Sequence, residues 1–311
     1  ICCLGIPLII GYNTVCAILR GMGDSKSPLA FVAIACVVNI VGDLLLSGLF
    51  SMGAAGVAIA TVVAQGISFL VGLIYLMKKG IGVPFSRADI QFSAAMSGRI
   101  LKQGIPLAIK SILVNLSFML ITAIINAMGV TASAAMGVGD KIVSFAFLPQ
   151  TSFSNSISVI VAQNMGAKKP ERAKQATLYG MATCIVWSVC FLALSQLFPS
   201  ALPALFTRDL AVQEMCGQYL KAYSLDGVLV SIVFCLSSMF TGCGRSTFTM
   251  VQDLVTTFLV RVPVTYFVSR ISGITLFEIG LAAPAASVLG IVICLVYLKM
   301  GKWKEGFLFN Q

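Results

Sequence analysis

Three residues in an otherwise apolar stretch have the types and the spacing of a small cation site. Asn39 and Asp43 are four residues apart, and Thr61 follows Asp43 by eighteen. If these segments are helices, residues four apart share one face, so the amide and the carboxylate project to the same side. A carboxylate, an amide carbonyl and a hydroxyl are hard oxygen ligands that suit Na⁺, and the carboxylate alone can accept H⁺. The pattern predicts a binding site for Na⁺ or H⁺.

Asp43 and Thr61 are predicted to lie at similar depth on two neighbouring antiparallel helices, in the outer half of a membrane. Asp43 precedes Phe50 by seven residues, about 10 Å of helix, and Thr61 follows Gly53 by eight residues, about 12 Å. An ionised Asp at the centre of a membrane helix costs about 2.5–3.5 kcal/mol, so it persists where a cation visits it or where it faces a wet cavity. The alternative is that Asp43 hydrogen-bonds locally or lies nearer the interface.

The elements that would position these residues are long apolar segments. Of the 311 residues 58% are hydrophobic and 10% are charged, against about 25% charged in a typical soluble domain. Apolar runs of roughly twenty residues are typical of membrane helices. A transmembrane barrel would instead alternate apolar and polar residues. The sequence therefore predicts an all-α polytopic membrane protein with nine segments, at 2–19, 29–50, 53–77, 104–128, 131–163, 176–198, 217–240, 247–269 and 278–299.

The composition argues against several other classes of protein. Ten cysteines form no CxxC pair, and most lie inside apolar runs, so they are interpreted as small packing residues and not as a zinc or redox site. There is no histidine, so proton chemistry would use carboxylates. No paired-aspartate motif and no GxSxG nucleophile setting supports an intramembrane enzyme, and we expect no cofactor beyond the coupling ion.

Basic residues gather in alternate breaks between the segments. Only Arg208 and Arg270 fall on one side, whereas fifteen lysines and arginines fall on the other: Arg20, Lys26, Lys78, Lys79, Arg87, Arg99, Lys102, Lys168, Lys169, Arg172, Lys174, Arg245, Lys299, Lys302 and Lys304. The positive-inside rule makes the richer side cytoplasmic, so the C-terminus is predicted to be cytoplasmic. The basic residues lie between apolar runs and not on one face of a soluble domain, which argues against a nucleic-acid partner.

An internal repeat divides the chain. GMGDS at 21–25 resembles GCGRS at 242–246, and LIYLMKKG at 73–80 resembles LVYLKMGK at 295–302. Both copies run in the same direction, as in parallel repeats of alternating-access transporters. We therefore expect the last three helices of an N-lobe in 1–77, an amphipathic cytoplasmic linker in 78–103, and a six-helix C-lobe in 104–311. The chain begins within an apolar run and without Met, so three preceding helices are expected to complete a six-plus-six bundle.

Several motifs, taken in order, resemble the multidrug and toxic compound extrusion (MATE) transporters. They are RGMGDSKSP at 20–28, NIVGD at 39–43, GAAGVAIAT at 53–61 and LPQTSFSNSISVIVAQNMGAKKPERAK at 148–174. The resemblance covers the chain from the family's fourth helix to its twelfth. It implies a two-lobed antiporter that exports cationic amphiphilic compounds in exchange for Na⁺ or H⁺. We expect such a protein to act as a monomer in the cell membrane.

The resemblance also implies roles for particular residues. In this family an Asn, an Asp and a Thr at the positions of Asn39, Asp43 and Thr61 help form the cation site of the first lobe, together with an Asp on the first helix, which this chain lacks. In the second lobe some members use acidic residues on the seventh and tenth helices. The segment 104–128 has none, and Asp226, near the outer end of 217–240, is the only candidate for a second polar site.

Two questions stay open on the sequence alone. A flippase for a lipid-linked precursor has a related architecture and would need a basic cavity for pyrophosphate, with Lys110, Lys141, Lys221 and Arg261 as candidates. The charged residues of the second lobe also allow a purely structural interpretation, as snorkelling side chains or as buried ion pairs. This second set comprises Lys110, Asp140, Lys141, Asp226, Asp253 and Arg261.

Overall fold

The computed structural model describes residues 1–79, 91–271, 273–301 and 303, and these residues are folded into helices without any strand. They divide into two compact units, Ile1–Ser93 and Ala94–Gln311. The all-α architecture predicted from the apolar runs is confirmed. Much of the predicted linker, 80–90, lies outside the described residues, and its last part, 94–103, is already helical.

The first unit consists of α1 (Cys2–Gly21), α2 (Lys26–Asp43), the π-helical segment η1 (Leu44–Leu49) and α3 (Gly53–Lys79). α3 packs along both α1 and α2. Its core is a cluster of α1 and α2 side chains under aromatic residues of α3: Tyr12, Val15, Cys16, Leu19 and Phe31, with Phe69 and Tyr75. The buried Ser68 hydroxyl of α3 donates to the Phe31 carbonyl of α2 at 3.1 Å. This bond helps to fix the position of α3 along α2.

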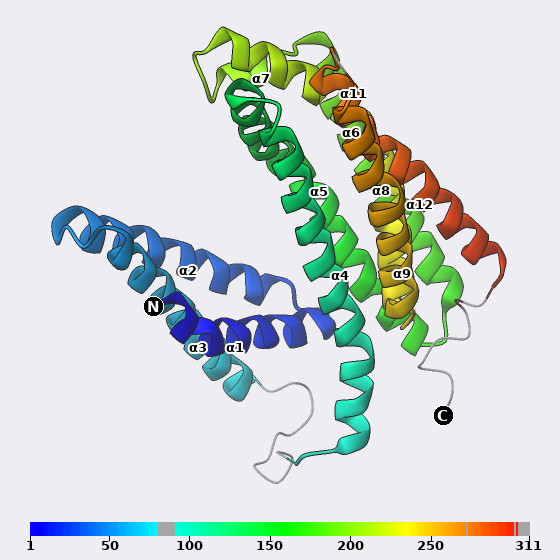
Figure 1. Ribbon diagram of the computed structural model, residues 1–311. Helices are drawn as coiled ribbons and strands as arrows, with labels where there is room; N and C mark the ends of the chain where they lie inside the picture. Colours follow the sequence, from blue (N-terminus) through cyan, green and yellow to red (C-terminus); the bar gives the residue numbers. More distant parts are fainter. Residues whose placement is uncertain (80–90, 272, 302, 304–311) are drawn as a thin grey trace. The chain divides into compact units, whose positions relative to one another are not determined.

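The second unit is a larger helical bundle, shown from teal to red in Figure 1. Its elements are α4 (Ala94–Asn126), α5 (Val130–Gly166), α6 (Pro170–Leu197), α7 (Ala201–Ala204), α8 (Leu210–Gly242), α9 (Ser246–Thr256), η3 (Thr257–Arg261), α10 (Val262–Ser269), α11 (Leu276–Gly280) and α12 (Ala282–Lys299). α8 packs against α5, α6, α11 and α12. In its most apolar stretch 56% of the residues are buried, against 11–39% in the other candidate spans, so α8 is the central helix.

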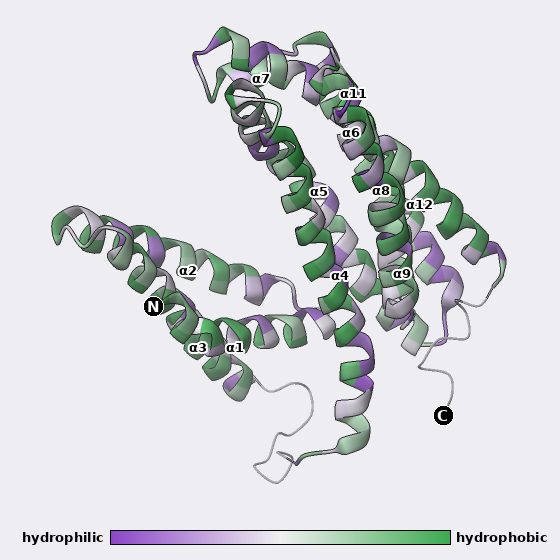
Figure 2. Cartoon of the chain, viewed as in Figure 1, coloured by the Kyte–Doolittle hydropathy of each residue, from purple (hydrophilic) through white to green (hydrophobic). Residues whose placement is uncertain are grey.

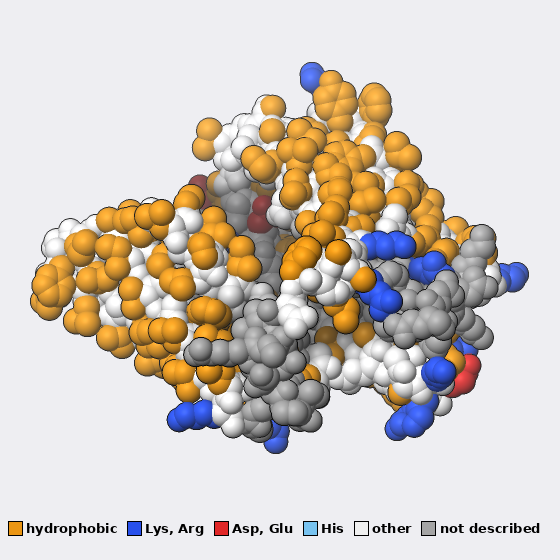
Figure 3. Space-filling model, turned by 90° about the horizontal axis from the view of Figure 1, so that it is seen from below, with side chains coloured by type: hydrophobic (Ala, Val, Ile, Leu, Met, Phe, Trp, Pro, Cys, Tyr) orange, Lys and Arg blue, Asp and Glu red, His pale blue; other side chains and the backbone are white. Residues whose placement is uncertain are grey.

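Within the described residues, eight helices are long and apolar enough to cross a membrane. Green, hydrophobic residues predominate in these helices in Figure 2, and hydrophobic side chains cover much of the surface seen in Figure 3. Large apolar side chains such as Leu4 and Phe267 are 85% and 69% exposed, as expected where lipid replaces water.

The ninth predicted segment, 131–163, forms α5 but is not among these eight apolar helices. Two of its polar side chains are buried and donate hydrogen bonds to neighbouring helices. Gln150 is 1% exposed, and its Nε2 donates to Ser188 Oγ on α6 at 2.6 Å. Ser154 Oγ donates to the Phe234 carbonyl on α8 at 3.1 Å. Because these groups have protein partners, the helix can be more polar than its neighbours.

The internal repeat has the same backbone turn in both copies. Gly23 and Gly244 have φ of +89° and +79°, the left-handed region that glycine adopts without a steric penalty. In the first copy the Asp24 amide donates to the Leu19 carbonyl at 2.9 Å, and in the second the Arg245 amide donates to the Phe240 carbonyl at 2.9 Å. Each bond closes the end of a helix as in a Schellman motif. The similarity of GMGDS and GCGRS therefore reflects one shared helix ending.

Candidate functional site

α2 and α3 bring two of the three predicted cation ligands into contact. Asn39 Nδ2 donates to Thr61 Oγ1 at 3.3 Å, and the Thr61 hydroxyl donates to the Val57 carbonyl at 2.9 Å. The amide nitrogen is thereby turned toward α3, which leaves the Asn39 carbonyl oxygen available to another ligand. Close approach of the helices is possible because Gly42 faces Ala60, where an added Cβ would lie 2.8 Å from the Ala60 Cβ.

Asp43 carries an unsatisfied buried oxygen. It is the last residue of α2 and directly precedes η1, and π-helical turns are frequent at functional sites. Its Oδ1 is buried and has no hydrogen-bond partner among the described residues. This observation disfavours the alternative in which Asp43 is satisfied by a local hydrogen bond. A buried carboxylate oxygen without a donor is costly unless a cation or proton neutralises it.

A fourth polar residue, which the sequence analysis missed, belongs to the same unit. Gln65 Oε1 on α3 is likewise buried and has no partner within the described part of the chain. It follows Thr61 by four residues and therefore shares its face of α3. The four-residue spacing between Thr61 and Gln65 is visible in the sequence and could have identified Gln65 as a candidate.

The charge carried by these side chains of the first unit would suit a monovalent cation. Asp43 supplies one negative charge, while Asn39 and Thr61 supply neutral oxygens. One carboxylate among neutral oxygens compensates a single positive charge and leaves no excess for a divalent ion. The same carboxylate could instead take a proton, so the residues suit either Na⁺ or H⁺.

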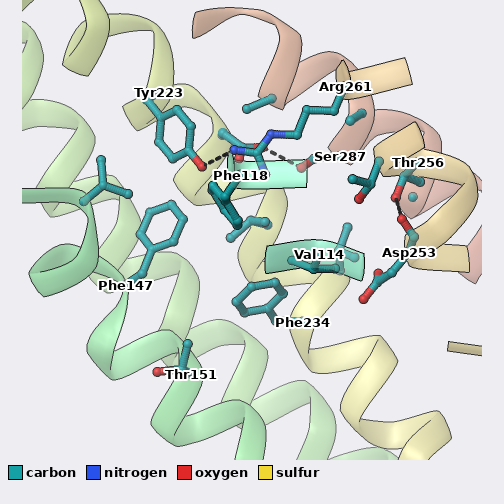
Figure 4. Close-up of a pocket in the computed structure, with 18 of the residues that line it drawn as sticks. Val114, Phe118, Phe147, Thr151, Tyr223, Phe234, Asp253, Thr256, Arg261 and Ser287 are labelled. Atoms are coloured by element: carbon teal, nitrogen blue, oxygen red, sulfur yellow. Dashed lines mark hydrogen bonds between the residues drawn. The ribbon is translucent and has the colours of Figure 1, made fainter. Parts of the chain in front are cut away.

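The second unit contains a cavity of about 550 Å³ between α4, α5, α8, α9, η3 and α12. Figure 4 shows its aromatic side chains, with Phe118, Phe147, Tyr223 and Phe234 around the open volume. Four charged residues also line it: Asp140, Asp226, Asp253 and Arg261. Its size and its mixture of apolar walls with few polar groups are typical of a site for a drug-sized molecule.

Asp226, the candidate from the sequence, lies in this cavity with a partner. It is 3% exposed, and Ser287 Oγ of α12 donates to its Oδ1 at 2.5 Å. The sequence placed it near the outer end of a segment 217–240. α8 begins at Leu210, so Asp226 lies near the middle of the helix.

Two other charged groups of the cavity have different surroundings. Asp253 is ion-paired with Lys110 of α4 at 2.6 Å, which bears out the structural interpretation of Lys110 as half of an ion pair. The Arg261 guanidinium donates from Nη2 to the Tyr223 hydroxyl at 2.8 Å, and its central carbon lies 4.5 Å from the centroid of the Phe118 ring. Figure 4 shows Arg261 reaching across the cavity between these two aromatic side chains.

The sequence model of one family, described as MatE, matches residues 106–267, from α4 to α10. This chain belongs to the MatE family. The match includes the polar-rich helix α5 and the central helix α8, and it confirms the resemblance drawn from the motifs.

Curated relatives of this MatE chain extend the similarity to nearly all of it. It is 29% identical over 308 residues to "Probable multidrug resistance protein YpnP" of Bacillus subtilis, covering 99% of this chain and 68% of that protein. It is 25% identical over 297 residues to "FAD transporter" of Shewanella oneidensis, covering 94% of this chain and 65% of that protein. The chain thus spans about two thirds of the length of these relatives.

Solved structures show the same fold for this MatE chain. A MOP superfamily transporter of Pyrococcus furiosus, described as having a binding pocket of reverse polarity, superposes with a TM-score of 0.89 at 20% identity, covering 96% of this chain and 68% of that one. At this identity the likeness establishes the helical fold alone and carries no information about the substrate. The apolar helices and the MatE match together indicate a multi-pass membrane protein.

Proposed function

We propose that this chain is part of a cation-coupled antiporter that exports amphiphilic, cationic compounds across the cell membrane. Membership of the MatE family and the names of several relatives as multidrug resistance proteins support this class of transport. Na⁺ or H⁺ enters in exchange, bound by Asp43 with Asn39 and Thr61. No covalent chemistry is required, so the protein acts as a transporter and not as an enzyme.

The observation that carries the proposal is the unsatisfied, buried Oδ1 of Asp43. A coupling cation neutralises this carboxylate in one half of the cycle. When the cation leaves, the carboxylate becomes unfavourable again in its low-dielectric surroundings, and binding of a cationic drug competes to satisfy it, directly or through a helix shift. Exchange follows because one negative charge cannot stabilise both ligands at once.

The flippase alternative receives less support from the cavity of the second unit. Asp140, Asp226 and Asp253 line it together with a single cation, Arg261. Of the other basic residues proposed for pyrophosphate, Lys110 is ion-paired with Asp253 and Lys141 is exposed. An acidic excess favours ligands with a cationic group over a pyrophosphate.

A transport assay separates these two functions. The full-length protein in proteoliposomes should move the fluorescent cation ethidium against its gradient when a Na⁺ or H⁺ gradient is imposed. Ethidium movement that ignores both gradients, together with translocation of a lipid-linked pyrophosphate, would favour the flippase.

The orientation of the second unit is tested by cysteine labelling. Lys169 and Arg208 are both exposed, and they lie beyond opposite ends of α6, whose 28 residues span about 42 Å. In a cysteine-free background, a membrane-impermeant maleimide added to intact cells should label Arg208→Cys and not Lys169→Cys, because the basic breaks are cytoplasmic. Both variants should react in opened membranes. Labelling of position 169 from outside would reverse the orientation.

A further inference from the structure

The cavity of the second unit contains a cation without an ion-pair partner. In the described part of the chain, no carboxylate oxygen lies within 4.0 Å of the Arg261 guanidinium, and its one hydrogen bond goes to the Tyr223 hydroxyl. A guanidinium has five N–H donors. Contact with the Phe118 ring offsets part of the desolvation cost, and the other N–H donors of this half-buried side chain can bind a ligand in the cavity. The best acceptor is a carboxylate or phosphate group, which a guanidinium binds through two parallel hydrogen bonds.

An unpaired anion lies in the same cavity. Asp253 is paired with Lys110 and Asp226 with Ser287, whereas no hydrogen bond or ion pair of the Asp140 carboxylate occurs among the described residues. Asp140 projects from α5, and Arg261 belongs to η3. The cavity therefore presents one unpaired positive and one unpaired negative group on different helices.

A second polar group in the cavity also lacks a partner. Gln252 is 2% exposed, and its Oε1 accepts from Ser237 Oγ at 2.9 Å, so its orientation is fixed. Its Nε2 is buried and has no acceptor within the described residues. The absence of a side chain at Gly290 leaves space beside it, since a Cβ there would lie 3.2 Å from this nitrogen. A buried donor without an acceptor on a cavity wall indicates that a ligand supplies one.

These groups discriminate between ligands by charge. A purely cationic ligand would pair with Asp140 and leave Arg261 unpaired in a low-dielectric cavity, and a purely anionic ligand would do the reverse. Asp140 and Arg261 are half-buried, and a charge left unpaired in such surroundings is unfavourable. A ligand with both charges satisfies both residues, and the aromatic walls accommodate its apolar body. A volume of about 550 Å³ is within the usual range of roughly 300–1,000 Å³ for drug-sized ligands.

We propose that this cavity binds zwitterionic amphiphiles, with Arg261 holding the anionic group and Asp140 the cationic group. The proposal rests on the export function proposed above and narrows its substrates. It makes Arg261 a specificity-determining residue: the residue selects, among compounds with a cationic group, those that also carry an acid.

Three probes with one scaffold test this proposal by direct binding to the purified full-length protein. They are a zwitterionic fluoroquinolone, its methyl ester, which keeps only the ammonium group, and its N-acetyl derivative, which keeps only the carboxylate. Their own fluorescence reports binding. The wild-type protein should bind the zwitterion at least about tenfold more tightly than either derivative, about 1.4 kcal/mol or more. No cation gradient is present, so the result does not depend on whether transport is cation-coupled.

Two variants test which residue binds which charged group of the ligand. Arg261→Gln should weaken binding of the zwitterion by about tenfold without weakening binding of the methyl ester, whereas Asp140→Asn should weaken the zwitterion and the ester together. Arg270→Gln is the matched control, because Arg270 is exposed outside the cavity yet makes the same kinds of contact, a hydrogen bond to Tyr266 Oη at 3.2 Å and a ring contact at 5.1 Å. It should bind all three probes as the wild type does.

Two results would overturn the proposal. One is equal binding of the zwitterion and its ester by the wild-type protein. The other is an equal loss of both probes in Arg261→Gln, which would make Arg261 a structural residue of the cavity wall. Arg261→Lys separates charge from folding: it should retain part of the selectivity for the zwitterion, because an ammonium still attracts the acid but cannot bind it in a bidentate manner.

Discussion

Asp43→Asn in the full-length protein is expected to lower gradient-driven efflux of a cationic drug by about tenfold or more. The substitution keeps the shape of the side chain and removes its charge, so neither Na⁺ nor H⁺ is bound as a counter-ion. Membrane insertion should be unimpaired, because the substitution removes a charged carboxylate, which is costly within a membrane helix. The measurement is ethidium efflux from vesicles against an imposed Na⁺ or H⁺ gradient, normalised to the amount of protein.

Asp209→Asn is the matched control for this variant. Asp209 is exposed and caps α8 through hydrogen bonds from the amides of Ala211 and Val212, and asparagine caps helices about as well. The control should therefore transport normally. Thr61→Ala should weaken efflux less than Asp43→Asn, because it removes one neutral ligand and the Asn39 contact. Undiminished gradient-driven efflux by Asp43→Asn would show that this carboxylate is structural and that coupling lies elsewhere, with Asp226 the next candidate.

Gly242→Ala is expected to destabilise the second unit. An added Cβ at this buried glycine at the end of α8 would lie 2.5 Å from the Ser158 carbonyl oxygen and 2.9 Å from the Val161 Cβ, both on α5. A backbone oxygen cannot rotate away, so α5 and α8 must separate. Overpacking of this kind typically costs about 1–3 kcal/mol, which corresponds to roughly 2–12 °C in a domain of this size. The measurement is the thermal transition in detergent.

Gly137→Ala provides the comparison for that experiment. Gly137 lies in α5, and no described atom is within 4 Å of its added Cβ. Alanine should there stabilise the helix by about 0.5–1 kcal/mol through backbone entropy alone. A transition temperature of Gly242→Ala equal to that of Gly137→Ala would contradict the close packing of α5 and α8.

The apolar runs were sufficient to predict the helices, whereas their ends depended on polar residues that the runs do not include. α8 begins at Leu210 because Asp209 caps it, although the hydrophobic run starts later, and this moved Asp226 to the middle of the helix. α4 begins at Ala94 and includes Arg99 and Lys102, since charged side chains are acceptable on a helix that extends beyond the apolar layer.

Contacts between helices could be predicted only in part. Counting residues from the turn placed Asp43 level with Thr61, but the structure pairs Thr61 with Asn39, one helical turn away. The π-helical segment η1 lies between Asp43 and the turn, and its wider coil changes the register that an ideal helix would give. The partners of Arg261 and the unpaired Gln252 Nε2 depend on side chains far apart in the sequence, and no local pattern specifies them.

The most direct test of coupling is to reverse the exchange. In proteoliposomes that contain the full-length protein, an outward drug gradient should drive Na⁺ or H⁺ inward, followed with radioactive Na⁺ or a pH-sensitive dye. Our account predicts cation movement that requires the drug in the wild-type protein and is absent in Asp43→Asn. Drug movement by the wild type without movement of either cation, or equal cation movement by Asp43→Asn, would contradict it.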